Sequence, residues 1–164
     1  MRIIVLFTIL ICSVRSEAQT YILSNEQVVF SFQTITGKEV IVAKDTGNKY
    51  LVYRFGTAGN IEFEFPDSKE HSWDKFEYSF YLRGGGRQNE GMDLNYLQFT
   101  NEGYKYVVYN TYFASDNKSR VGVKVIQLSN NKIINIQGLV KSRKGSLVDF
   151  RDNEKIRQGD ELFD

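Results

Sequence analysis

The chain has 164 residues, with 21 lysine and arginine residues against 20 aspartate and glutamate residues and a formal net charge of +1. This length is typical of one domain, and the charge balance argues against a nucleic-acid-binding protein, which usually carries a clustered basic excess. Apolar residues make up 41% of the chain and aromatic residues 14%, and there is a single proline. These values exclude a disordered chain and predict a globular protein with an apolar core.

The first residues have the layout of a secretory signal peptide. Arg2 gives a positive start, residues 3–14 are almost all apolar, and Ser16 and Ala18 place small residues at the −3 and −1 positions of a cleavage site. The apolar run is shorter than the roughly 20 residues that a membrane-spanning helix needs. We therefore expect a cleaved signal peptide over residues 1–18, with an uncleaved anchor as the alternative.

Removal of that segment leaves residues 19–164, which we expect to form a single β-rich domain in the periplasm or outside the cell. Cys12 is the only cysteine, so the mature chain has none and depends on its core rather than on disulfides. A lipid anchor on Cys12 is less favoured because the preceding residue, Ile11, is not small. We expect no stable membrane anchor after cleavage.

The mature chain shows the alternation of apolar and polar residues that is typical of strands. The predicted strands are Gln27–Thr34, Lys38–Ala43, Tyr50–Phe55, Asn60–Phe65, Phe76–Leu82, Leu94–Thr100, Tyr104–Phe113, Val121–Leu128, Ile133–Val140 and Gly145–Phe150. Residues 155–163 are a candidate for a short edge strand, and residues 68–74 for one helical turn. This spacing predicts an all-β fold, either a single antiparallel β-barrel or a β-sandwich of about 8–10 strands.

The segment Arg83-Gly84-Gly85-Gly86-Arg87 interrupts the strand pattern. Glycines let the backbone adopt positive φ and approach another group closely, and arginine binds carboxylates or phosphates through a planar fork. We predict that residues 83–87 form a partner-binding loop, with Tyr81 packing beside it. A flexible hairpin connection or a glycine bulge is the alternative, and the lysine that would make the segment a P-loop is missing.

Four tyrosines alternate onto the face opposite the predicted core: Tyr53, Tyr81, Tyr109 and Tyr112. Exposed tyrosines form protein-binding or sugar-stacking surfaces, whereas tyrosines paired across strands stiffen a sheet. The sequence leaves both interpretations open.

The residues needed for common catalytic and metal sites are missing. His71 is the only histidine and lies in a polar turn, and without a mature cysteine a zinc site of Cys and His ligands is excluded. Glu62 and Glu64 alternate with apolar neighbours, so they should face solvent rather than form a glycosidase pair. Asp93 and Asn95 lack the spacing of a calcium loop. We predict no catalytic residue, no metal and no cofactor.

The segment Tyr50–Pro66 reads YLVYRFGTAGNIEFEFP and resembles a YRFG…IELEFP hairpin of small exported bacterial proteins. Residues 81–97 and 104–109 are similar to the same group, so the resemblance covers about half of the chain. It implies a bacterial, periplasmic or secreted setting and brings no catalytic residue or ligand. The general build also resembles that of periplasmic lysozyme inhibitors, which are small exported β-barrels, although this chain lacks their cysteines.

These observations favour an exported, non-enzymatic binding protein. The most concrete version is a periplasmic inhibitor or immunity-type protein that inserts the glycine-rich loop into the active site of a hydrolase. Its partner would be another envelope or secreted protein, not a nucleic acid. The alternatives are a β-barrel that carries a small ligand and, less favoured, a carboxylate-based hydrolase.

Overall fold

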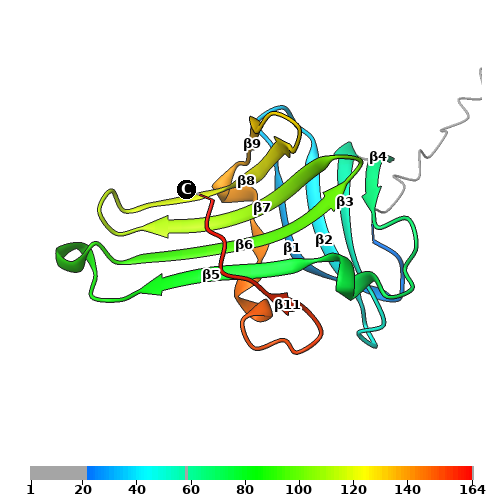
Figure 1. The fold of residues 1–164 in the computed structure, drawn as a ribbon, viewed down its shortest axis with the longest axis horizontal. Coiled ribbons are helices and arrows are strands. Elements are labelled where there is room, and N and C mark those ends of the chain that lie inside the picture. Colours follow the sequence, from blue (N-terminus) through cyan, green and yellow to red (C-terminus); the bar gives the residue numbers. More distant parts are fainter. Residues whose placement is uncertain (1–21, 58, 164) are drawn as a thin grey trace, which may run out of the picture.

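The computed structural model describes residues 22–57 and 59–163, which form two β-sheets packed against each other (Figure 1). Strands make up 55% of the structure, and no helix in the described ranges reaches seven residues. The predicted all-β fold is confirmed, and it is a sandwich because neither sheet closes into a barrel. The predicted signal peptide at residues 1–18 lies outside the described residues. Within the described ranges, no helix is long and apolar enough to cross a bilayer.

The first sheet has the strand order β10-β1-β2-β3-β4, and all its neighbouring strands are antiparallel. Its strands are β1 (Glu26–Gln33), β2 (Glu39–Asp45), β3 (Leu51–Thr57), β4 (Asn60–Phe65) and β10 (Lys144–Gly145). Short turns join β1 to β4 in sequence, and the first of them contains Gly37 at a φ of 82°. A residue with a Cβ rarely adopts this conformation, so the glycine fixes the turn.

The second sheet has the strand order β11-β5-β6-β7-β8-β9. Its strands are β5 (Glu77–Arg83), β6 (Met92–Asn101), β7 (Tyr104–Phe113), β8 (Lys118–Gln127), β9 (Lys132–Gln137) and β11 (Arg157–Gln158). Strands β5 to β9 form consecutive antiparallel hairpins, whereas β11 pairs in parallel with the first two residues of β5. The three central strands, at ten residues each, are longer than any strand of the first sheet.

Aromatic rings fill the space between the sheets. Phe99 on β6 lies at their centre, since its ring centroid is 4.2 Å from that of Phe65 and 4.9 Å from that of Tyr106. Further rings within 6.3 Å of Phe99 are those of Tyr53, Phe63 and Phe76. Buried rings contribute strongly to stability, so this cluster is expected to be a main source of the free energy of folding.

A 3-10 turn, η1 (Ser72–Lys75), links the two sheets between β4 and β5 and lies at the end of the segment predicted to hold one helical turn. The buried hydroxyl of Ser72 accepts a hydrogen bond of 2.9 Å from the backbone N–H of Leu51. The indole N–H of Trp73 donates to the carbonyl oxygen of Asn48 at 3.1 Å. These contacts fix the crossing from one sheet to the other.

The prediction of a strand over Gly145–Phe150 is wrong. Only β10 pairs there, and Leu147–Phe150 form the 3-10 turn η4. The hydroxyl of Ser146 accepts a hydrogen bond of 3.1 Å from the backbone N–H of Val148 and so caps the turn. The two apolar ends of η4 are three residues apart and both buried, which fits the 3-10 repeat.

The prediction that Tyr53 lies on the face opposite the core is also wrong. Its side chain is 2% exposed and belongs to the cluster between the sheets. The neighbouring Val52 points to the other face of β3 and is buried there too, with Ile22 packed against its cluster. A strand buried on both faces shows no alternation from which its core side can be predicted.

An ion-pair network lies on the outer side of the first sheet. The Arg54 guanidinium, 2% exposed, donates to both carboxylate oxygens of Glu26 at 2.5 and 2.9 Å and to Glu64 at 2.5 Å. The Tyr50 hydroxyl also donates to Glu26, at 2.9 Å. Burial alone would raise the pKa of the Glu26 carboxyl, but these hydrogen bonds and one from the backbone N–H of Leu23 outweigh it, and the pKa falls from 4.5 to about 2.

Acid is expected to destabilise the protein through Glu26. The pKa of this carboxyl is lower in the folded protein than in the unfolded chain, so the unfolded chain takes up the proton first as the pH falls. The contribution of about 3 kcal/mol is complete above the unfolded-state value of 4.5 and is lost as the pH approaches 2. Urea unfolding at neutral pH and at about pH 3 measures this loss. A Glu26→Gln variant should lose clearly less stability between these two pH values. An equal loss in both proteins would contradict the role given to the Glu26 carboxyl.

Candidate functional site

Strands β5 to β8 run past the first sheet, and their far residues form one end of the molecule together with two hairpin loops (Figure 1). This region, termed the projecting end, comprises residues 80–83 of β5, 92–95 of β6, 110–113 of β7 and 118–121 of β8. The strands pair there without a bulge. Its inner face continues the face that packs on the first sheet, and its outer face points the other way.

The glycine-rich loop is the hairpin connection between β5 and β6 at the tip of the projecting end. Gly85 and Gly86 have φ angles of 90° and 61°, which favour glycine, and a 3-10 turn, η2 (Arg87–Asn89), follows. The backbone N–H of Gly91 donates to the carbonyl oxygen of Gly86 at 2.8 Å and closes the loop. The N–H of Ala114 donates to the carbonyl oxygen of Gly91, also at 2.8 Å, so the two hairpin loops support each other.

The predicted partner-binding residues all gather at the projecting end. Tyr81 and Arg83 lie on the outer face of β5, Gly84 opens the loop, and Arg87 begins η2; all four are exposed. The Arg83 guanidinium lies 3.8 Å from the carboxylate of Glu90. Among the described residues no ion pair involves Arg87, so its guanidinium is available to a ligand.

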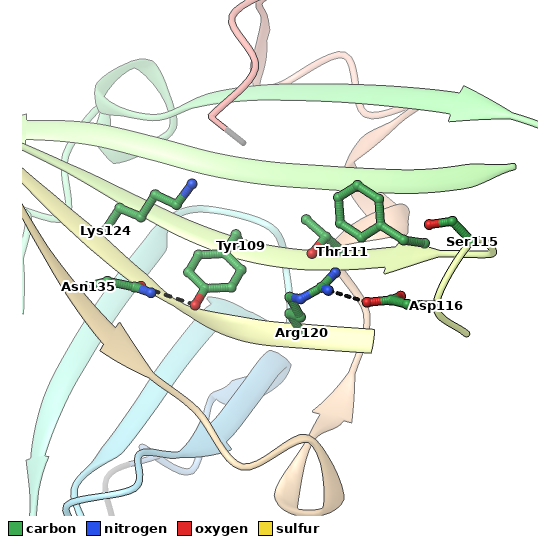
Figure 2. A pocket seen from close by; sticks show the side chains of 8 residues that line it. Tyr109, Thr111, Ser115, Asp116, Arg120, Lys124 and Asn135 are labelled. Carbon is green, nitrogen blue, oxygen red and sulfur yellow. Dashed lines mark hydrogen bonds and ion pairs between the residues drawn. The ribbon is translucent and has the colours of Figure 1, made fainter. Parts of the chain in front are cut away.

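A groove of about 400 Å³ opens on the outer face across β7, β8 and β9 (Figure 2). Its lining residues are Tyr109, Thr111, Phe113, Ser115, Asp116, Arg120, Lys124 and Asn135. The Tyr109 hydroxyl donates to the side-chain oxygen of Asn135 at 3.1 Å, and Arg120 forms an ion pair with Asp116 (Figure 2). Four polar side chains of the groove are therefore held in pairs before any ligand binds.

The outer face around the loop and the groove carries a surplus of positive charge. Its basic residues are Arg83, Arg87, Lys118, Arg120 and Lys124, and its acidic residues are Glu90 and Asp116. Two of the cations lie over rings: the Arg120 guanidinium is 4.8 Å from the ring centroid of Phe113, and the Lys124 ammonium is 5.7 Å from that of Tyr109. Cations set among rings suit a partner that presents carboxylates beside apolar surface.

The inner face of the projecting end carries a polar network in place of an apolar core. Arg151, which follows η4, donates to Asp93 at 2.5 Å and to the side-chain oxygen of Asn95 at 2.9 Å. The Tyr78 hydroxyl donates to the same amide oxygen at 2.6 Å, and the amide nitrogen of Asn95 donates to Asp93 at 2.6 Å. The Arg151 guanidinium also lies over the Phe80 ring, 4.9 Å from its centroid. The Arg151 side chain thus contacts both β5 and β6 at the projecting end.

A second arginine, Arg143, holds β7, the strand next to β6. Arg143, in the connection before β10, donates to the side-chain oxygen of Asn110 on β7 at 2.9 Å. Between these contacts lies a cleft of about 330 Å³, whose lining includes Tyr112, Ser119 and Val148. The two arginines brace strands that the first sheet does not cover.

Two groups of the network, Tyr78 and Arg151, have raised pKa values. Burial raises the pKa of Tyr78 to about 12, although the neighbouring Arg151 acts in the opposite direction. Burial also works against the charge on Arg151, but contacts with Tyr78 and Asp93 outweigh it and raise the pKa of the guanidinium. Neither group titrates near neutral pH, so the arrangement serves as a brace rather than as a proton-transfer site.

Replacing Arg151 with alanine is expected to lower the free energy of unfolding by about 2–3 kcal/mol, because Asp93 and Asn95 lose a charged donor in a largely buried place. Urea denaturation measures the change. Arg157→Ala is the matched control, since Arg157 is 72% exposed in its ion pair with Glu77 and should contribute about 1 kcal/mol or less. Equal effects of the two substitutions would contradict the bracing role.

The residues considered above as calcium ligands belong to the Arg151 network, and the single histidine lies in an exposed turn. Asp93 and Asn95 bind Arg151, and the side chain of His71 is 77% exposed in the turn before η1. In the described residues, no group of three or more His, Cys, Asp or Glu side chains is arranged to hold a metal ion.

Among the other side chains of the site, the sequence singled out Tyr109 and Tyr112 as tyrosines on the face opposite the core. Tyr109 lies on that face but is buried there, whereas the prediction for Tyr112 is wrong, because it lies on the inner face beside Ser119 and Val148.

Alternation along β8, with Val121 and Val123 in the core, already places Arg120 and Lys124 on the opposite face. Arg151 offered no such signal, because its partners lie 58 and 56 positions earlier in the chain.

No family model, curated protein or solved structure matches this chain. The candidate site therefore rests on its own geometry.

Proposed function

We propose that the protein is an exported, non-enzymatic binding protein that attaches to another protein through its projecting end, as an inhibitor or immunity-type protein does. The observation that carries this proposal is the placement of Tyr81, Arg83 and Arg87 together at an exposed tip. A tip held by regular strand pairing and by the Arg151 network loses little conformational entropy on binding.

The charge of the tip supports an acidic partner surface. Arginine forms paired hydrogen bonds with carboxylates, and Tyr81 beside Arg83 adds apolar contact area. A cleft lined with carboxylates, such as the active site of a cell-wall hydrolase, combines both features. The groove on the outer face, which is lined by Arg120 and Lys124, extends the positive surface that would meet the acidic partner.

The two alternative functions find less support. A small-ligand carrier needs a hollow interior, whereas stacked rings around Phe99 occupy the space between these sheets. A carboxylate-based hydrolase needs a pair of accessible acids, whereas Glu62 is paired with Lys38 and Glu64 with Arg54.

A pull-down from the cell envelope and medium of the producing organism, with the chain from Gln19 as bait, tests the proposal. One stoichiometric protein partner is expected. The double variant Arg83→Ala/Arg87→Ala should bind it about 100-fold more weakly in a titration, because central arginines are frequent hot spots.

Lys132→Ala/Lys141→Ala is the matched control, since it removes the same charge from exposed positions outside the projecting end and should bind normally. Unchanged affinity of the arginine variant would show that the loop does not bind the partner. A co-purifying small molecule without a protein partner would favour the carrier instead.

A further inference from the structure

The outer edge of β5 is half covered. On the side away from β6, β11 pairs only with Glu77 and Tyr78. The backbone N–H of Gly159 then donates to the carbonyl oxygen of Tyr78 at 2.8 Å, and the hydroxyl of Ser79 donates to that of Glu161 at 2.6 Å. No strand of the described residues pairs with this edge from Phe80 onward.

The backbone of this open segment faces outward at alternate residues. Because the Tyr78 carbonyl accepts its hydrogen bond on the open side, the N–H and C=O groups of Phe80 and Leu82 point to the same side. Ser79 and Tyr81 direct theirs to β6. The edge thus offers donors and acceptors at the spacing that an added strand needs.

The side chains of the segment are apolar and exposed. Phe80 and Tyr81 are each 41% exposed and Leu82 is 58% exposed. Natural sheet edges usually carry charges, proline or a bulge that prevent further pairing. The exposed edge of β4 has Glu62 and Glu64, but the open part of β5 has no charge before Arg83.

We propose that the partner adds an extended strand to β5 along Phe80–Arg83, and that this strand carries acidic side chains that meet Arg83 and Arg87. This inference rests on the proposed function and specifies how the partner is held. Main-chain hydrogen bonds from Phe80 and Leu82 supply the docking, and the two arginines against the single Glu90 of the loop supply the charge preference.

A second copy of this chain suits the edge less well. Antiparallel pairing of two Phe80–Arg83 segments would bring the glycine-rich loop of each copy against the Arg157–Gly159 segment of the other, which already occupies the edge beside Tyr78. The opposite edge of the second sheet is β9, which also exposes an apolar side chain, Ile133. The C-terminal end of β9 is covered, because the backbone N–H of Ile35 donates to the carbonyl oxygen of Gln137 at 3.0 Å.

Amide hydrogen exchange measured by NMR tests the inference without knowledge of the natural partner. The probe is a short capped peptide of alternating threonine and valine with glutamates at both ends, and the control peptide has lysines in their place. In the free protein the Phe80 and Leu82 amides should exchange fast and the Ser79 and Tyr81 amides slowly. The glutamate peptide at saturation should slow Phe80 and Leu82 by at least about tenfold, and the lysine peptide should not.

Two variants distinguish the contribution of the Leu82 backbone N–H from that of the Leu82 side chain. Leu82→Pro removes the outward N–H and should abolish the protection, because proline is tolerated at sheet edges but cannot donate. Leu82→Ala keeps the N–H and should retain most of the protection from exchange. Protection at β9 instead, or no protection by the glutamate peptide, would overturn the inference.

The partner captured in the pull-down distinguishes failure of the strand-addition inference from failure of the proposed function. A partner that depends on Arg83 and Arg87 but leaves the Phe80 and Leu82 amides exchanging fast would overturn strand addition and leave the binding function intact. Peptide protection without any partner that depends on the loop arginines would support the edge as a docking strand and count against the proposed function.

Discussion

Replacing Arg54 with methionine is expected to lower the free energy of unfolding by about 3–5 kcal/mol, one of the two largest effects in this protein. Glu26 is fully buried, and Arg54 supplies two of its hydrogen bonds. Without the guanidinium, the carboxylate must stay charged in a buried place or take up a proton at neutral pH. Urea denaturation followed by circular dichroism measures the change.

Two further variants test the cause. Lys38→Met removes a partner of Glu62 in an ion pair whose side chains are about one-third exposed, so it should cost about 1 kcal/mol or less. Glu26→Gln added to Arg54→Met should recover part of the loss, because the buried charge is then gone. A double variant as unstable as the sum of the two single variants would show that the charge is not the source of the effect.

Replacing Phe99 with alanine is expected to cost about 3–5 kcal/mol. Its ring stacks on Phe65 from the first sheet and on Tyr106 from the second, so its loss leaves a cavity between the sheets. Thermal and urea unfolding measure the change.

Phe80→Ala is the matched control. This ring is 41% exposed at the projecting end, and its removal should cost about 1 kcal/mol. A Phe99→Ala variant no less stable than this control would contradict the central place given to the ring cluster.

Sequence patterns predict the strands better than they predict which face of a strand is buried in the core. Alternation along β8 is clear because Val121 and Val123 lie in the core while Arg120 and Lys124 lie on the opposite face. The core side of Tyr53 on β3 could not be predicted because both faces of that strand are buried. The 3-10 turn η4 was missed because six residues with three apolar side chains fit a strand and a tight turn equally well.

The candidate site could be predicted only where its signal is local. Three glycines between Arg83 and Arg87 are such a signal, and the loop is where that signal places it. The braces on the inner face are contacts between distant segments: Arg143 meets a residue 33 positions earlier, and Arg151 one 58 positions earlier. Such pairs leave no trace in local spacing, and the open edge of β5 depends on where β11 stops pairing.

Trp73 gives this protein a built-in optical reporter. It is the only tryptophan, and its buried indole is held by Asn48 at the crossing between the sheets. The turn that contains it lies at the start of β5, whereas the glycine-rich loop lies at the other end of that strand (Figure 1). Its fluorescence should therefore change when the sandwich unfolds and stay constant when the tip is occupied. In every variant considered above, a change in this emission then indicates loss of the fold rather than engagement of the loop.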